Sequence, residues 1–206
     1  PGDYDPKHSG SPRPLRVAFP PALPGIEEAP IQGVFELRRS PVSDARGQFQ
    51  RIYCADTLAS LVNGGKIAQI NHSVTVNVGT IRGMHMQLGT PIENKVITCF
   101  AGEVFDVALD LRRNSPTFLK WYGVRLNPTR NNAVVIPAGV AHGFQSMKPN
   151  SELLYLHTAN YDPQNEVGIS YQDPIVNISW PLPPKHLSDR DLSFRDLDVE
   201  FSGFDI

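Results

Sequence analysis

The chain of 206 residues is 40% hydrophobic and contains 16 glycines and 19 prolines. The hydrophobic content excludes a wholly disordered chain, and the surplus of glycine and proline disfavours a helical bundle and favours a turn-rich β fold. Nineteen basic and 21 acidic residues give a net charge of −2, so we expect no broad nucleic-acid-binding surface.

The location of the protein is predicted from what the sequence does not contain. No apolar run approaches the ~18 residues of a membrane span, and no segment near the start reads as a signal peptide. Cys54 and Cys99 are too few for a disulfide framework, so both thiols are expected to be reduced and buried. These features predict a cytoplasmic protein that binds neither membrane nor nucleic acid.

Residues 1–26 form the first predicted unit, a proline-rich N-terminal arm. Eight of the 19 prolines lie within the first thirty residues. Because proline breaks helices and cannot donate to a central sheet, we expect an extended arm that is partly disordered or lies along a neighbouring subunit. Residues 27–206 form the second unit, a globular domain.

The domain reads as a series of short strands separated by turn signals, which is typical of a sandwich or barrel. One short helix is expected over residues 55–62, ended by Asn63-Gly64-Gly65, and another is expected to begin at Ser188. The predicted strands cover residues 31–38, 66–78, 95–100, 104–111, 118–126, 133–136 and 152–157.

The segment 79–87 contains the first histidine of interest, His85. Strict alternation along a strand would put Arg82 on one face and His85 on the other. Gly79 begins the segment and Gly83 lies two residues before His85, as expected where backbone lies close to a ligand. A single histidine in a strand is more often structural than catalytic, so this segment alone does not define a site.

A second histidine, His142, follows the turn Pro137-Ala138-Gly139. Gly-x5-His in the first segment and Pro-x-Gly-x2-His in the second, on an all-β background, resemble the two-part signature of cupins. That resemblance implies a small jelly-roll barrel.

Metal-binding cupins bring two histidines and a carboxylate from the first motif and one histidine from the second. Here Gln87 stands where the second histidine would be, and Glu93 is the nearby carboxylate. A metal-dependent oxygenase that uses His85, Glu93 and His142 stays an alternative. Because one imidazole is missing, we expect no metal and no other cofactor.

Further motifs follow in order between residue 31 and Asp191. They are residues 43–49 (Ser-Asp-Ala-Arg-Gly-Gln-Phe), 69–73 (Gln-Ile-Asn-His-Ser), 81–85 (Ile-Arg-Gly-Met-His), 102–112, 115–117, 141–144 (Ala-His-Gly-Phe), 161–169, 173–174, 180–181 and 187–191 (Leu-Ser-Asp-Arg-Asp). Together they are similar to dTDP-4-dehydrorhamnose 3,5-epimerases, the metal-free cupin enzymes of deoxysugar biosynthesis. The resemblance implies an all-β cupin jelly-roll barrel with short peripheral helices.

The resemblance also implies four catalytic residues. His85 would be the general base that removes a proton beside the ketone, with its tautomer fixed by Asp191. Tyr155 would be the acid on the opposite face, since a phenol with an ordinary pKa of ~10 is protonated at neutral pH. Lys95 would lie beside the 4-keto oxygen, where negative charge develops.

Substrate binding is likewise implied by resemblance. Arg82 would lie near the diphosphate or the sugar, and His142, paired with Asp106, would orient the sugar end. The full set implied for substrate binding is Arg46, Phe49, Gln69, Asn71, Arg82, Asp106, His142 and Glu166.

Three positions depart from the pattern of the family. Arg51 stands where a glutamate is common near the nucleotide base, which leaves the identity of that base open. Asn160 replaces the first residue of a common Tyr-Tyr pair, and residues 91–95 lack the usual glycine before Lys95.

The sequence therefore predicts an epimerase of a nucleotide-diphosphate-linked 4-keto-6-deoxyhexose that acts at C3, C5 or both. The family also implies a homodimer, which would cover the edge strands of a single barrel. The alternatives are a 3-only epimerase of a non-thymidine nucleotide sugar, the metal-dependent oxygenase, and a sugar-nucleotide binder without catalysis.

Overall fold

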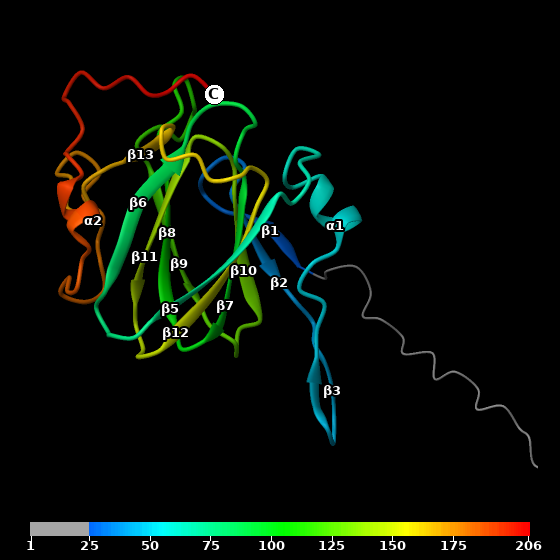
Figure 1. The fold of residues 1–206 in the computed structure, drawn as a ribbon. Coiled ribbons are helices and arrows are strands. Elements are labelled where there is room, and N and C mark those ends of the chain that lie inside the picture. The colour runs from blue at the N-terminus through cyan, green and yellow to red at the C-terminus, as the bar shows by residue number, and fades with distance from the viewer. Residues whose placement is uncertain (1–24) are drawn as a thin grey trace, which may run out of the picture.

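The computed structural model describes residues 25–206, so most of the predicted N-terminal arm lies outside the described residues. Two antiparallel sheets face each other and form a barrel (Figure 1). The helices are short and lie at the periphery. The predicted all-β class is therefore confirmed. Ile26, the last residue of the predicted arm, begins the first strand.

Each sheet is assembled from strands that are distant in sequence. The six-stranded sheet has the order β1 (Ile26–Glu28), β2 (Phe35–Arg38), β10 (Asn132–Ile136), β7 (Lys95–Ala101), β12 (Ser151–His157) and β5 (Gln69–Thr75). The five-stranded sheet has the order β13 (Glu166–Gly168), β6 (Ile81–Gln87), β11 (Val140–Ser146), β8 (Val104–Asp110) and β9 (Trp121–Leu126). In this order β5, which carries the predicted motif 69–73, is an edge strand.

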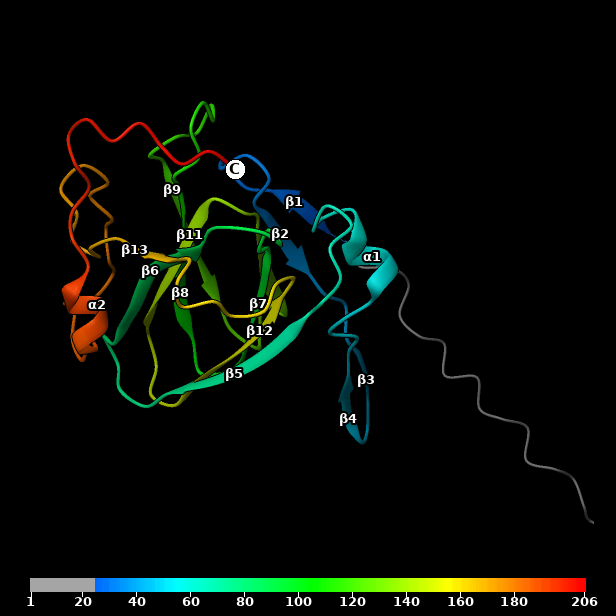
Figure 2. The ribbon, with the colours of Figure 1, turned by 45° about the horizontal axis from the view of Figure 1, so that its top comes forward.

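A small hairpin projects away from the barrel. It consists of β3 (Val42–Asp44) and β4 (Gly47–Phe49), which pair only with each other among the described strands. Figure 2 shows the hairpin extending beyond the two sheets. Its side chains are exposed, so the hairpin contributes little to the core of its own barrel.

The two helices lie close to the predicted positions. The helix α1 (Ala55–Ala59) is shorter than predicted, because turns replace its last residues and Asn63 and Gly64 take positive φ values of 51° and 73°. The helix α2 (Asp189–Ser193) begins after Ser188 as predicted, and the Ser188 side chain accepts a hydrogen bond from the backbone N–H of Asp191.

Apolar side chains fill part of the space between the sheets. Ile97 and Leu153 project from the six-stranded sheet, and Val124 and Phe144 project from the five-stranded sheet. Burial of this kind contributes about 25 cal/mol per Å² of apolar surface, so this cluster stabilises the contact between the sheets.

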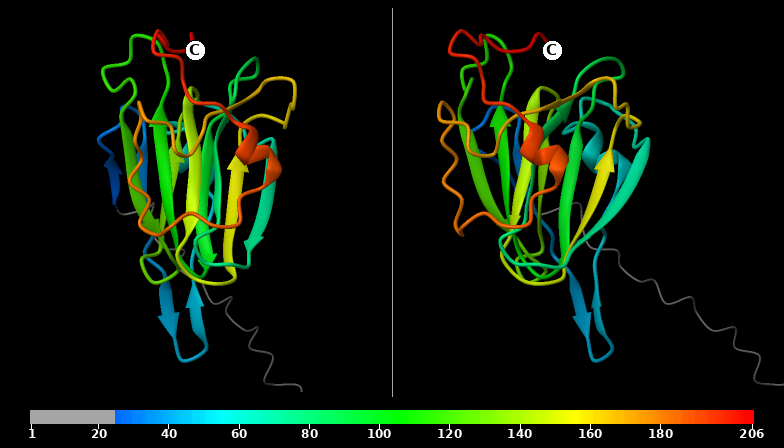
Figure 3. Two further views of the ribbon diagram at one scale, coloured as in Figure 1. Left: turned by 90° about the vertical axis from the view of Figure 1, so that its left-hand side faces the viewer. Right: turned by 60° about the vertical axis from the view of Figure 1, so that its left-hand side comes forward.

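The outer faces of both sheets are also covered. Leu58 of α1 packs over Val96 and Leu156 of the six-stranded sheet. Chain after β13 crosses the outside of the five-stranded sheet, as Figure 3 shows, and there Val176 joins a cluster with Leu109. This crossing brings α2 to the side of β6.

The strand β6 contains a bulge that determines which way its side chains point. His142 is opposite His85, and Phe144 is opposite Arg82, so two steps along β11 match three steps along β6. Gly83 lies within the bulge with φ of 116°, and a Cβ there would be 2.6 Å from the Cα of Gly143. The bulge turns Arg82 and His85 toward the same cavity, so the prediction that they face opposite ways is wrong.

Both cysteines are free, as predicted. Cys99 is buried in the core between the sheets, and Cys54 is only half-buried, which corrects the prediction that both thiols are buried. Over residues 25–206, no helix has the length and apolar character needed to cross a membrane.

Candidate active site

A cavity of about 490 Å³ lies between the two sheets. Strands β5 and β12 form one wall, β6 and β11 form the facing wall, and the segment around α2 closes one side. Its lining side chains are Asn71, His72, Ser73, Arg82, His85, His142, Phe144, Tyr155, His157, Ser188, Arg190 and Asp191.

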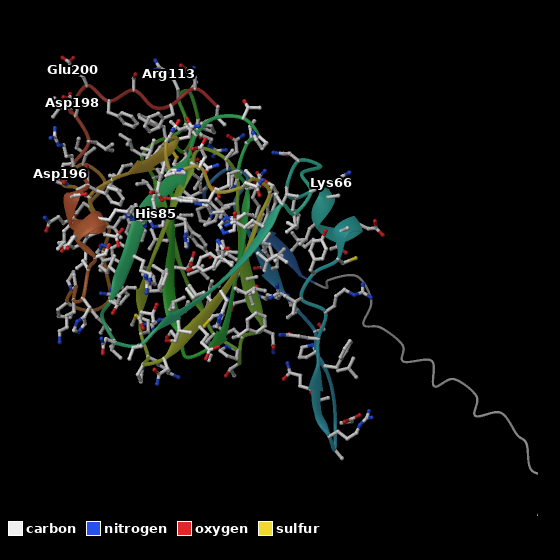
Figure 4. All side chains as sticks on the ribbon, in the orientation of Figure 1. Lys66, His85, Arg113, Asp196, Asp198 and Glu200 are labelled. Carbon is white, nitrogen blue, oxygen red and sulfur yellow. The ribbon has the colours of Figure 1, made fainter. Side chains whose placement is uncertain are left out.

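His85 lies on β6 beside α2 (Figure 4). Burial lowers the pKa of this imidazole well below its ordinary value, and the charges of Lys95 and His142 lower it further. The ring of Phe194 meets the ring of His85 edge-on, with the ring centroids 6.4 Å apart. His85 is therefore neutral at physiological pH, which is the form that a general base requires.

Asp191, the predicted partner of His85, lines the same cavity and is buried. Its Oδ2 accepts a hydrogen bond of 2.9 Å from the Ser188 hydroxyl. Its Oδ1 has no hydrogen-bond partner among the described residues, and no hydrogen bond there joins Asp191 to His85. The structure brings the two residues to one cavity, and the orienting role of Asp191 stays a prediction.

Tyr155 projects into the cavity from β12, on the wall opposite β6. Its hydroxyl is 3.3 Å from the Ser73 hydroxyl, and its ring meets that of His142 edge-on at 6.1 Å between centroids. Burial raises the pKa of Tyr155 far above its ordinary value. The phenol is therefore protonated and can donate a proton from the side opposite His85.

His142 pairs with Asp106, as predicted. The Nε2 of His142 is 2.8 Å from Oδ2 of Asp106, and both side chains are almost completely buried. Burial raises the pKa of Asp106, while the charge of His142 and the hydrogen bond to it act in the opposite direction. The pair holds the His142 ring between Phe144 and Tyr155.

Lys95 is buried on β7 and forms an ion pair with Glu93, with Nζ 3.2 Å from Oε2. The other oxygen of Glu93 is 2.9 Å from Nδ1 of His157, which lines the cavity. Lys95 is not among the residues that line the cavity, but its charge acts on His85. Its predicted place beside the ketone is consistent with this electrostatic contact and stays a prediction.

The remaining predicted binding residues either line the cavity, contact a lining residue, or lie outside it. Arg82 and Asn71 line the cavity, and Gln69 is joined to Asn71 by a hydrogen bond of 3.0 Å from Nε2 to Oδ1. Glu166 lies outside the lining and forms an ion pair of 3.1 Å with Arg190.

Sequence reasoning missed Arg190. This residue lines the cavity, and its positive charge acts on His85. Its position in the motif 187–191, directly before Asp191, could have pointed to it. Within that motif a role was predicted only for the carboxylate of Asp191.

Arg46 and Phe49 are two further predicted binding residues that do not line the cavity. Both lie in the projecting hairpin formed by β3 and β4, where Arg46 pairs with Asp44. Neither lines the cavity of its own chain.

The ligand set of the oxygenase alternative is engaged in other contacts. Both oxygens of Glu93 are occupied by Lys95 and His157, and Nε2 of His142 is bonded to Asp106. In residues 25–206, no three side chains of histidine, cysteine, aspartate or glutamate come together in a group that could hold a metal ion. The geometry therefore favours acid–base chemistry by the side chains themselves.

Comparison with known proteins identifies related sequences. A family profile described as dTDP-4-dehydrorhamnose 3,5-epimerase matches residues 28–198. The dTDP-4-dehydrorhamnose 3-epimerase of Streptomyces niveus is 39% identical over 162 residues, which cover 78% of this chain and 78% of that protein. The dTDP-4-dehydrorhamnose 3,5-epimerase of Shigella flexneri is 39% identical over 160 residues, which cover 75% of this chain and 87% of that protein.

Solved structures share the fold. NovW, a 4-keto-6-deoxy sugar epimerase from the novobiocin biosynthetic gene cluster of Streptomyces spheroides, has a TM-score of 0.79 and 36% identity over 84% of this chain and 86% of that chain. The dTDP-6-deoxy-D-glucose-3,5-epimerase of Legionella pneumophila Philadelphia 1, in complex with dTDP-4-keto-L-rhamnose, has a TM-score of 0.80 and 33% identity over 87% and 97% of the two chains. The chain belongs to the dTDP-4-dehydrorhamnose 3,5-epimerase family, an isomerase family of cupin-like fold.

Proposed function

We propose that the protein epimerises a nucleotide-diphosphate-linked 4-keto-6-deoxyhexose at C3, C5 or both, in deoxysugar biosynthesis. One observation carries the proposal. His85 and Tyr155 line one cavity from two facing sheets, the imidazole neutral and the phenol protonated. Inversion beside a ketone needs this combination, because returning the proton to the same face only regenerates the starting isomer.

The reaction has two proton transfers. Neutral His85 removes the proton on the carbon beside the ketone, and the electron pair of the broken C–H bond moves into an enolate. Tyr155 then donates its hydroxyl proton to the opposite face of that carbon and becomes a phenolate. Exchange with solvent returns a proton to Tyr155 and removes one from His85, which resets the enzyme.

Positive charge near the cavity supports the enolate and the diphosphate. Lys95 is buried close enough to His85 to affect its pKa, so its field also reaches an enolate oxygen formed there. Arg82 and Arg190 line the cavity, and guanidinium groups bind phosphate oxygens through paired hydrogen bonds.

A homodimer is part of the proposal. The edge strand β5 carries exposed apolar side chains, among them Ile70 and Val74, and the hairpin of β3 and β4 carries the exposed Phe49. A second copy whose hairpin lies along β5 would cover this edge and bring Arg46 and Phe49 to the cavity of its neighbour. Val74→Lys is expected to shift the protein to monomer in analytical ultracentrifugation, and an unchanged dimer or a wild-type monomer would contradict this.

The test of the reaction is deuterium exchange in D2O followed by NMR. We expect wild-type protein to exchange solvent deuterium into at least one 4-keto-6-deoxyhexose linked to dTDP, CDP, GDP or UDP. His85→Asn should abolish exchange, and the control His186→Asn, at an exposed histidine outside the cavity, should retain it. Absence of wild-type exchange with all four substrates would overturn the proposal, and binding without exchange would favour the non-catalytic binder.

The 3-only reaction is the second candidate, because a relative with 39% identity is named a 3-epimerase. The same NMR spectra identify the carbon that exchanges, and the four nucleotides report which base is accepted.

A cytoplasmic location also belongs to the proposal, supported by the free thiols of Cys54 and Cys99.

A further inference from the structure

A series of hydrogen bonds runs from Lys95 through the six-stranded sheet toward the rim of the cavity. Lys95 on β7 and Gln69 on β5 are both cross-strand partners of His157 on the intervening strand β12. Glu93 connects Lys95 to His157, with distances of 3.2 Å to Nζ and 2.9 Å to Nδ1. These three side chains are nearly buried, with exposed fractions of 7% for Glu93, 10% for Lys95 and 12% for His157.

The series continues beyond His157 into the predicted substrate-binding residues. Nε2 of His157 is 3.4 Å from Nδ2 of Asn71. Oδ1 of Asn71 accepts a hydrogen bond of 3.0 Å from Gln69, and Oε1 of Gln69 accepts one of 3.1 Å from the backbone N–H of Tyr161. Each amide side chain therefore has a donor on one side and an acceptor on the other.

The direction of the bonds in the series is set from both sides, by the charge on Glu93 and by the backbone N–H of Tyr161, which can only donate. Burial alone would raise the pKa of Glu93, but the hydrogen bond from His157 and the charge of Lys95 lower it below its ordinary value. An ionised carboxylate only accepts hydrogen bonds, so Nδ1 of His157 carries a proton, and Nε2, which faces the side-chain amide of Asn71 at 3.4 Å, is the acceptor. Asn71 must then turn its amide N–H to His157 and its oxygen to Gln69.

We propose that Glu93 is a positioning residue that holds Lys95 and, through the tautomer of His157, orients Asn71 and Gln69 on the neighbouring strand. The kinetic part of this inference rests on the proposed epimerase function, in which Lys95 serves the enolate oxygen and the two amides contact substrate. This assignment also gives His157 a definite role as the link between Lys95 and the two amide side chains.

Glu93→Gln is the informative variant, since it preserves shape and removes the charge. A glutamine has one oxygen, which turns to the Lys95 ammonium because two donors cannot face each other. Its N–H group then faces Nδ1 of His157 and requires that nitrogen to accept. The proton of His157 is therefore expected to move from Nδ1 to Nε2, and Asn71 and Gln69 lose their fixed orientations.

The first measurement is the 15N NMR spectrum of the histidine ring nitrogens in substrate-free protein, with the signals of His157 assigned from their loss in His157→Gln. We expect protonated Nδ1 in the wild type and protonated Nε2 in Glu93→Gln. The inference is overturned by an unprotonated Nδ1 in the wild type, or by the same tautomer in both proteins. This readout requires no catalytic activity.

The second measurement is steady-state kinetics. Glu93→Gln is expected to lower kcat and raise KM, each by about 10- to 100-fold, because Lys95 and the two amide side chains lose their positioning. Glu93→Asp retains the charge and should recover part of the loss. The control is Glu103→Gln, which removes a carboxylate bonded to Arg125 and Asn127 outside the cavity and should leave both constants unchanged.

The two proposals fail in different ways. A wild-type protein without exchange activity contradicts the proposed function and leaves the tautomer measurement intact. An active wild type together with a folded Glu93→Gln protein of unchanged kcat and KM contradicts the positioning role alone, with folding checked by thermal melting.

Discussion

Arg82 and His85 stand three positions apart on β6, yet both side chains line the same cavity. In a regular strand this odd spacing would send them to opposite faces. The bulge between them supplies the extra residue, and Gly83 passes so close to β11 that no side chain fits there. The proposed base and a cation proposed for the diphosphate thus share one wall because of one glycine.

Gly83→Ala should therefore destabilise the protein and move His85. The positive φ and the contact of a new Cβ with Gly143 and the carbonyl of His142 are expected to lower the free energy of unfolding by about 2–5 kcal/mol. Gly64→Ala is the matched control, since its φ is 73° and its Cβ would meet nothing within 4 Å. It should cost about 1 kcal/mol. Urea unfolding measures both, and equal losses would show that the close approach at Gly83 is unimportant.

Tyr155→Phe should separate exchange from inversion. The variant keeps His85, which can remove a proton and return deuterium from solvent to the same face. It lacks the opposite-face acid, so net inversion is expected to fall about 10²- to 10⁴-fold while deuterium incorporation continues. NMR in D2O measures both on the same sample. Parallel loss of the two signals would assign the opposite-face acid to another group.

The pH profile of kcat/KM should reflect the burial of His85. Burial and the charge of Lys95 lower the pKa of His85, so the base stays neutral as the pH falls through its ordinary value of ~6.5. The rate is expected to stay on its plateau through that range and to fall only at lower pH. Lys95→Met removes one of the charges, so the acidic decline should move to higher pH. A decline centred near 6.5 in the wild type would contradict this assignment.

Phe194 should protect His85 from water. Its ring meets His85 edge-on and occupies the space that a Cβ on Gly168 would need. Phe194→Ala is expected to expose His85, raise its pKa and move the acidic decline of kcat/KM to higher pH, while Phe194→Leu should shift it less.

Gly168→Ala alone should destabilise the protein through a clash with Phe194. The double variant Gly168→Ala with Phe194→Ala should then be more stable than the sum of the single losses predicts, and simple additivity would argue against the contact.

The strands were predictable because their pattern is local. Residues 95–100 and 104–111 read as apolar runs divided by a turn, and they correspond closely to β7 and β8. Alternation failed at Arg82, because the bulge depends on the close approach of Gly83 to Gly143, which lies on a strand sixty residues later. No periodicity within one strand records such a contact.

The residues that belong to the site were easier to predict than the contacts they make. Glu93 was considered only as a metal ligand, whereas its oxygens hold Lys95 and His157, the latter 64 positions away in sequence. Arg46 and Phe49 were expected to bind substrate, yet they lie on a hairpin away from the cavity of their own chain. Pairing between side chains that are distant in sequence leaves no periodic signal in a single sequence.

The crossing segment that supplies Ser188, Arg190 and Asp191 follows every strand of both sheets in the chain. A ribosome therefore finishes the barrel before it makes the wall that carries these side chains. Docking of this wall beside β6 completes the burial that lowers the pKa of His85, so the environment of the proposed base forms only after all strands of both sheets have been made.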